Sequence, residues 1–185
     1  MLFKLNQRGV ILFATLLLLS FQKLHAQEAT IEKSITGINV GLSGLSLSQE
    51  KRFTPTFSLR LEAGTGYARM QGSNVWYPYF AIQPRWYYNL EKRVSKTKNI
   101  RSNSGNFIST VVFYEPESVQ KINNGTIRSG FIFLGPVWGM RRQVGKRFSF
   151  EFSLGAGWYR RFNEDPENVF GQYIDLNFGY NFIKR

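Results

Sequence analysis

The chain has no cysteine, and its single histidine, His25, lies near the N-terminus. Without cysteine the chain forms no disulfide and offers no thiolate ligand to a metal ion. Acidic residues are also scarce, 12 against 24 lysines and arginines, so the chain is strongly basic. Long hydrophobic runs are missing as well. The apolar run at residues 10–19 is well short of the roughly 20 residues that a spanning helix needs.

The N-terminal segment has the pattern of a secretory signal peptide. Lys4 and Arg8 precede the apolar run, and the stretch that follows suits cleavage after Ala26. We expect removal of residues 1–26, which leaves residues 27–185 as one domain by size. The mature chain then contains neither imidazole nor thiol, and its 21 basic and 12 acidic residues give a net charge of +9.

This composition argues against most catalytic and cofactor chemistry. Hydrolysis of the Ser-His-acid type needs a base, and the mature chain has no histidine to supply it. Metal sites built on imidazole or thiolate are excluded for the same reason. A carboxylate calcium site at residues 163–168 is conceivable, although a short acidic loop is more often simply solvated. We therefore expect a protein that is not an enzyme, with no cofactor and no metal.

Residues 148–158, Phe-Ser-Phe-Glu-Phe-Ser-Leu-Gly-Ala-Gly-Trp, carry the strongest structural signal in the chain. Side chains alternate across a strand, so every second residue here is apolar and Glu151 lies in the middle of the opposite face. The pattern recurs along the chain without a helix that could cover the apolar faces. It predicts an all-β fold, a transmembrane antiparallel up-and-down barrel that turns its apolar face to lipid.

Seven strand runs are clear, and polar segments separate them. The expected turns and loops are residues 49–52, 68–75, 89–105, 115–128, 141–147 and 161–168. Residues 106–114 resemble a strand whose faces the pattern leaves unassigned. Bacterial barrels have an even number of strands, so we expect about eight. At Ser43-Gly44 the apolar residues change from even to odd positions, a slip of the apolar frame. Either this slip marks a hairpin that divides the first run, or residues 27–34 supply an edge strand.

The inward face of the predicted strands carries five ionisable groups. They are Arg60, Glu62, Arg85, Glu151 and Asp175. Buried charges must be paired, and the interior of an eight-stranded barrel is filled by side chains, so a structural ion-pair network is the favoured interpretation. A path for protons or small ions, or a carboxylate pair for acid/base catalysis, is the alternative.

Aromatic and basic residues gather between Arg85 and Arg101. Arg85 with Trp86, Tyr88 and Lys92 could form a stacking and phosphate-binding patch for single-stranded nucleic acid. An aromatic belt at the membrane interface explains the rings more simply, and an exported protein meets no nucleic acid. The basic turn at residues 89–105 is expected to be solvated, with acidic partners or anionic headgroups of the inner leaflet as the alternative.

Three segments resemble a known family. Residues 83–93 (Gln-Pro-Arg-Trp-Tyr-Tyr-Asn-Leu-Glu-Lys-Arg), 103–107 (Asn-Ser-Gly-Asn-Phe) and 138–142 (Trp-Gly-Met-Arg-Arg) are similar to segments of small outer-membrane β-barrel proteins of Bacteroidota, most of them uncharacterised. The resemblance implies architecture and not chemistry. The ending with Gly179, Tyr180 and Phe182 is similar to the C-terminal signal that the barrel assembly machinery reads, but three further residues follow it here.

These observations together predict a non-enzymatic protein of the outer membrane of a Gram-negative cell, with a structural or recognition role in the envelope. The alternatives are a small-solute channel or transporter and, third, a lipid A-modifying enzyme. Expected partners are outer-membrane lipids and, during biogenesis, periplasmic chaperones and the assembly machinery; we expect a monomer. Such barrels end on the periplasmic side, which places the turns at 49–52, 89–105 and 141–147 there.

Overall fold

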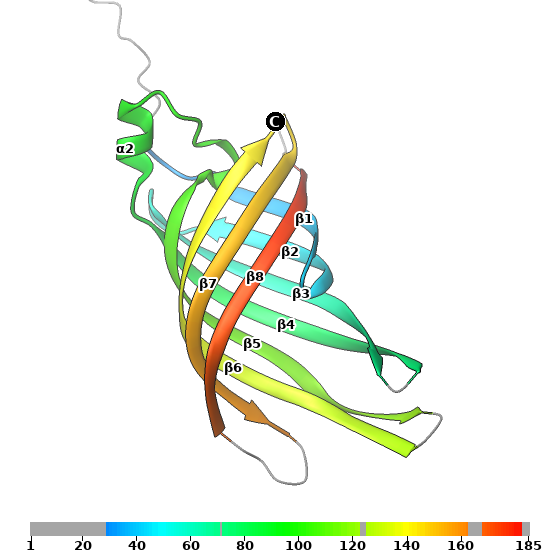
Figure 1. The fold of residues 1–185 in the computed structure, drawn as a ribbon. Coiled ribbons are helices and arrows are strands. Elements are labelled where there is room, and N and C mark those ends of the chain that lie inside the picture. The colour runs from blue at the N-terminus through cyan, green and yellow to red at the C-terminus, as the bar shows by residue number, and fades with distance from the viewer. Residues whose placement is uncertain (1–28, 71, 123–124, 163–167, 183–185) are drawn as a thin grey trace, which may run out of the picture.

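Eight β-strands make up most of the chain (Figure 1). The structure is a computed structural model that describes residues 29–70, 72–122, 125–162 and 168–182. The predicted signal peptide and most of the acidic loop at residues 163–168 lie outside these residues. The strands are β1 (Ser34–Gly41), β2 (Gly44–Arg52), β3 (Phe57–Met70), β4 (Ser73–Tyr87), β5 (Gly105–Ile122), β6 (Gly125–Val144), β7 (Phe148–Arg161) and β8 (Asn168–Phe182). Two short helices, α2 (Leu90–Ser95) and the 3₁₀ helix η1 (Arg101–Asn103), connect β4 to β5.

Each strand pairs antiparallel with the next, and β8 pairs with β1, so the sheet closes into a barrel. In the closing pair Val40 of β1 lies opposite Phe178 of β8. Closure lets a sheet satisfy its backbone hydrogen bonds within itself, which is what a spanning sheet needs in lipid. No helix in the described ranges is long and apolar enough to cross a membrane. The prediction of an all-β antiparallel barrel with about eight strands is confirmed.

The slip of the apolar frame marks the hairpin between β1 and β2. Gly44 has a φ of +113°, in the left-handed region that favours glycine. A Cβ at Gly44 would lie 2.1 Å from the carbonyl oxygen of Thr65, so this turn depends on glycine. The other alternative, an edge strand at residues 27–34, is wrong for the described residues, because 29–33 form no strand and β1 begins at Ser34.

Side chains alternate between the two faces of the barrel wall as the pattern predicts. Leu47, Phe148 and Phe178 point outward and are 58–60% exposed, whereas Ser149 and Asn177 point inward and are buried. The apolar face of residues 148–158 therefore does not line the lumen. In β5, whose faces the sequence left unassigned, the buried inward positions are Phe107, Ser109, Val111 and Phe113.

The strands run further than the apolar pattern predicts, so several expected loops are wrong. Residues 49–52 belong to β2 and residues 141–144 to β6. Residues 115–122 and 125–128 continue β5 and β6, with a shift of register between Glu115 and Ser118. Likewise, residues 68–70 belong to β3, residues 73–75 to β4, Arg161 to β7 and Asn168 to β8. Beyond the apolar belt both faces of a strand can be polar, so the period-two signal disappears while backbone pairing continues.

The segment between β4 and β5 covers one end of the barrel and is not the plain solvated turn that we expected. Leu90 and Ile100 from this segment are buried and pack with Ile31, Tyr87 and Phe107. Figure 1 shows α2 at the end of the barrel where β8 finishes. The exposed basic side chains of the segment are Lys92, Lys96, Lys98 and Arg101. One face of the segment thus closes the lumen while the other is solvated.

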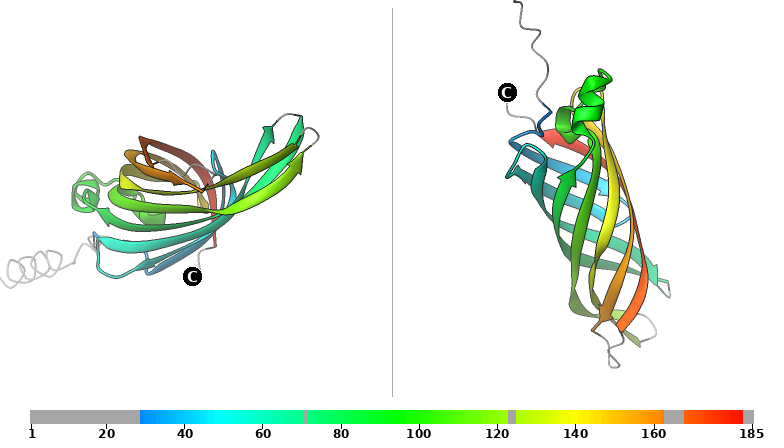
Figure 2. Two further views of the ribbon diagram at one scale, coloured as in Figure 1. Left: turned by 90° about the horizontal axis from the view of Figure 1, so that it is seen from below. Right: turned by 90° about the vertical axis from the view of Figure 1, so that its left-hand side faces the viewer.

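The opposite end of the barrel is uneven. Strands β1 and β2 have 8 and 9 residues, whereas β5 and β6 have 18 and 20. The β3–β4 and β5–β6 hairpins therefore extend well beyond the β1–β2 hairpin (Figures 1 and 2). A second apolar cluster fills the lumen in this half, and its buried aromatic members are Tyr79, Phe113 and Phe133. Many of the buried polar residues lie in the layer between the two apolar clusters and on β1 and β2, whereas buried Glu115 of β5 lies beyond Phe113.

Candidate functional site

Three arginines and three glutamates meet inside the barrel between the two apolar clusters. They are Glu50 from β2, Arg60 and Glu62 from β3, Arg85 from β4, Arg141 from β6 and Glu151 from β7. All six are buried, with at most 8% of any residue exposed. We call these six residues the lumen network.

Glu151 lies at the centre of the lumen network. Both carboxylate oxygens accept hydrogen bonds from Arg85, whose Nη1 donates over 2.9 Å to Oε2 and whose Nη2 donates to Oε1. Arg141 Nη1 and Arg60 Nη1 approach the same Oε2 atom at 3.7 and 4.0 Å. A bidentate guanidinium–carboxylate pair is among the stronger hydrogen-bonded contacts. Glu151 therefore binds all three arginines together across the lumen.

Glu50 connects the lumen network to the cover at the end of the barrel. Its Oε2 accepts a hydrogen bond from Arg141 Nη1 at 3.0 Å and lies 3.7 Å from Arg85 Nη1. Its Oε1 accepts hydrogen bonds from Tyr87 Oη at 2.9 Å and from Asn103 Nδ2 at 2.8 Å. Asn103 belongs to η1, so a carboxylate of the wall holds the covering segment in place.

Glu62 pairs with Arg60 on the same strand, and Asp175 stays apart from the arginines. Arg60 Nη2 donates to Glu62 Oε2 over 2.9 Å, and Tyr79 Oη donates to Glu62 Oε1 over 3.2 Å. Asp175 accepts hydrogen bonds from Asn177 Nδ2 and, over 3.5 Å, from Ser43 Oγ. Among the described residues no basic group lies within ion-pair distance of Asp175. The structure thus brings together four of the five predicted lumen residues and leaves Asp175 outside.

Sequence reasoning missed Glu50 and Arg141, because both lie in segments that we expected to be turns. Each continues an inward series: Ser46 and Ser48 lead to Glu50, and Val137 leads through Gly139 to Arg141. Extending the alternation by one or two positions past the apolar belt would have placed both side chains in the lumen.

The chemistry that the lumen network supports is mutual neutralisation. Three guanidinium groups face three carboxylates, and each carboxylate accepts hydrogen bonds from at least one arginine. Such saturated carboxylates are poorly placed to remove a proton from a substrate. Among the described residues no cluster of histidine, cysteine, aspartate or glutamate could hold a metal ion. The network and the two apolar clusters form successive layers of buried side chains inside the barrel.

The residues of the other candidate sites are separated or lie at the rim. Arg85 points into the lumen while Trp86 and Tyr88 point outward, so the stacking patch considered for nucleic acid does not form. Gly179, Tyr180 and Phe182 lie at the end of β8, where Tyr180 is opposite Ile38 of β1. Reading of this ending by the assembly machinery stays a prediction.

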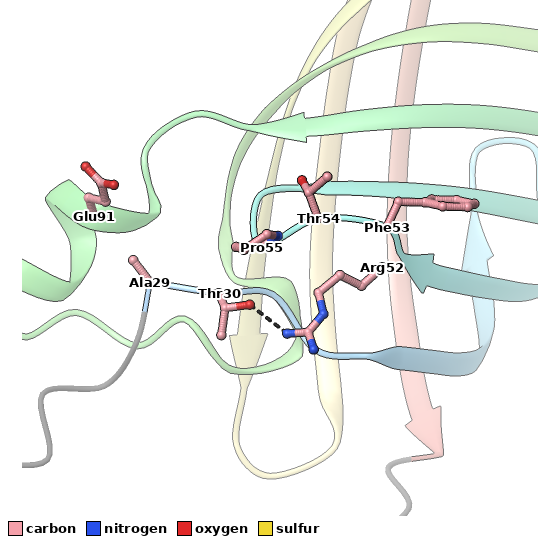
Figure 3. A pocket seen from close by; sticks show the side chains of 7 residues that line it. All are labelled: Ala29, Thr30, Arg52, Phe53, Thr54, Pro55 and Glu91. Atoms are coloured by element: carbon pink, nitrogen blue, oxygen red, sulfur yellow. Dashed lines mark hydrogen bonds between the residues drawn. The ribbon is translucent and has the colours of Figure 1, made fainter.

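A shallow pocket lies beside the covered end of the barrel (Figure 3). Its lining includes Phe53 and Pro55 from the β2–β3 turn and Glu91 from α2. Arg52 Nη1 donates across it to Thr30 Oγ1 over 2.6 Å, as the dashed line in Figure 3 marks. The pocket's arginine thus fastens the segment before β1 to the wall.

The fold and the lumen define a class of protein, the closed outer-membrane-type β-barrel with an apolar outer face and a charged interior. No protein-family model and no curated protein matches the chain. Among solved structures, the N-terminal β-barrel domain of Pseudomonas aeruginosa OprF is similar, with a TM-score of 0.50 and 12% sequence identity. The match covers 82% of this chain and 98% of that domain. At this identity the likeness concerns the fold alone.

Proposed function

We propose that this chain is an integral outer-membrane protein with a structural or recognition role in the envelope, and that it is neither a channel nor an enzyme. The observation that carries the proposal is the lumen network, in which three arginines and three glutamates neutralise one another across a barrel of eight strands. A barrel of this size is just wide enough for side chains to fill it. The apolar outer face gives the barrel its place in lipid.

The ends of the barrel support an orientation. Barrels of this class end on the periplasmic side, and β8 finishes at the covered end, so we infer that the covered end faces the periplasm. The β3–β4 and β5–β6 hairpins then extend from the cell surface (Figure 2). We infer that these hairpins are the surfaces for recognition, since buried and paired side chains occupy the lumen.

The proposed function also includes a route of export and assembly and a family for the chain. Residues 1–26 act as a signal peptide, and the chain reaches the outer membrane as a monomer through periplasmic chaperones and the barrel assembly machinery. The ending with Gly179, Tyr180 and Phe182 supports recognition by that machinery. Segments 83–93, 103–107 and 138–142 support membership of the small outer-membrane barrels of Bacteroidota.

Two experiments test this proposal. The protein should fractionate with the outer membrane, and its unboiled band should migrate faster than its boiled band on a denaturing gel. Purified protein in planar bilayers should show conductance no higher than background. A soluble protein without a gel shift would refute the membrane location, and a reproducible unitary conductance would favour a channel. Altered lipid A in a deletion strain would favour an enzyme instead.

A further inference from the structure

Two partly buried arginines lie at the covered end of the barrel, outside the lumen network. Arg142 near the end of β6 donates from Nη1 to the Gly105 carbonyl over 2.9 Å and from Nη2 to Asn106 Oδ1 over 2.6 Å. Arg93 of α2 donates from Nη2 to the Asn99 carbonyl over 2.6 Å. All these acceptors are neutral. Among the described residues neither arginine has a carboxylate within ion-pair distance, so both positive charges are uncompensated.

The covering segment holds these two arginines near each other. Asn99 Nδ2 donates to Gln143 Oε1 over 2.9 Å, and the Gln143 backbone N–H donates to Ser104 Oγ over 2.8 Å. These bonds fasten residues 99–104 to the end of β6. Asn89 links the two arginines, because its carbonyl accepts a hydrogen bond from the Arg93 backbone N–H over 3.0 Å and its Oδ1 accepts one over 2.8 Å from the backbone N–H of Asn106, the residue whose Oδ1 binds Arg142. Holding two like charges together is unfavourable unless an anion lies between them.

Aromatic side chains of the lipid-facing surface lead directly to this pair. Tyr88 and Trp138 are both partly exposed on the outer face, and Trp138 Nε1 donates to Tyr88 Oη over 2.8 Å. Asn106 Nδ2 donates to the same hydroxyl over 3.4 Å, and the other atom of that amide, Oδ1, binds Arg142. Tyrosine and tryptophan rings gather where the hydrocarbon meets the headgroups. The arginine pair therefore lies at headgroup level.

We propose that Arg93 and Arg142 bind the phosphate of an anionic phospholipid in the inner leaflet, with Tyr88 and Trp138 contacting the start of its acyl chains. This inference rests on the proposed outer-membrane location and orientation. A guanidinium matches phosphate oxygens in charge and geometry, and two of them favour a lipid such as phosphatidylglycerol, whose headgroup has no ammonium. Exposed lysines of the same segment add to the attraction, namely Lys92, Lys96 and Lys98. An acidic protein partner would have no need of the adjoining aromatic rings.

The test compares two matched double variants of the full chain, refolded in detergent. R93Q/R142Q removes the proposed site, and R160Q/R161Q removes two exposed arginines at the other end of the barrel. Each protein is mixed with equal amounts of phosphatidylglycerol and phosphatidylethanolamine, and retained lipid is counted by native mass spectrometry. The wild type and R160Q/R161Q should prefer phosphatidylglycerol equally. The preference of R93Q/R142Q for phosphatidylglycerol should be about 30-fold lower than that of the wild type, roughly a factor of five for each arginine removed.

An unchanged preference in R93Q/R142Q, or an equal loss in R160Q/R161Q, would overturn the lipid site. The single variant R93Q keeps the test decisive if the double variant does not refold, because Arg93 is on α2 and not in the barrel wall. Heat-modifiable migration separates the two proposals. A barrel that shows the gel shift but no lipid preference refutes the site alone, whereas a chain that forms no heat-modifiable barrel refutes the proposed function as well.

Discussion

The substitution Glu151→Gln tests whether the lumen network holds the barrel together. It keeps the shape of the side chain but leaves the guanidinium groups of Arg60, Arg85 and Arg141 facing only two carboxylates. The 2.9 Å bond from Arg85 Nη1 and the contact of Arg141 at 3.7 Å both lose their negative partner. Breaking a buried pair by removing one partner costs about 3–5 kcal/mol, because it leaves an uncompensated buried charge.

The assay is reversible urea unfolding of the refolded protein in detergent micelles. With a urea slope of about 2 kcal/mol per M, a loss of about 4 kcal/mol lowers the unfolding midpoint by about 2 M. Glu117→Gln is the matched control, because Glu117 is exposed on β5, and it should change stability by less than about 0.5 kcal/mol. In the double variant R85M/E151Q the charges balance again, so its loss should be smaller than the sum of the two single losses. A loss below about 1 kcal/mol for Glu151→Gln would refute the reasoning.

Three further substitutions test the outer face, the cover and the packing of the lumen. Leu154→Arg places a charge on the lipid face in the middle of β7 and should cost about 2–4 kcal/mol in bilayer unfolding titrations; a neutral result would contradict lipid contact. Asn103→Ala removes the 2.8 Å bond to Glu50, so amide hydrogen exchange in residues 99–104 should accelerate while the strands stay protected; unchanged exchange would mean that this bond does not fasten the cover. Gly139→Ala would bring a Cβ within 2.2 Å of the Phe107 ring and should cost about 1–3 kcal/mol, measured as an earlier loss of the heat-modifiable band; full stability would show that the ring can move aside.

Local alternation was enough to predict the wall of this protein. Along residues 148–158 and 173–182 each side chain has one of two directions, so polarity alone assigned the lipid face and placed Glu151 and Asp175 inside. The slip at Ser43-Gly44 was readable for the same reason, because a change of parity requires either a bulge or a turn.

Alternation failed at the rims. There residues of both parities are polar, so the ends of β2 and β6 looked like turns, and Glu50 and Arg141 were missed. The segment after β4 was misread in a related way. Its charged residues dominate its composition, whereas the cover depends on just two buried side chains, Leu90 and Ile100.

By itself the sequence determined the period of the strands, the apolar outer face and the lack of cysteine, with a single histidine in the whole chain. Only the tertiary structure decided which charges meet. Arg85 and Glu151 are 66 residues apart, and Arg141 and Glu50 are 91 apart. Neither pair lies on adjacent strands, so no local pattern relates them. Closure of the barrel brings them across the lumen, and their pairing follows from the cost of leaving any one of these charges buried and alone.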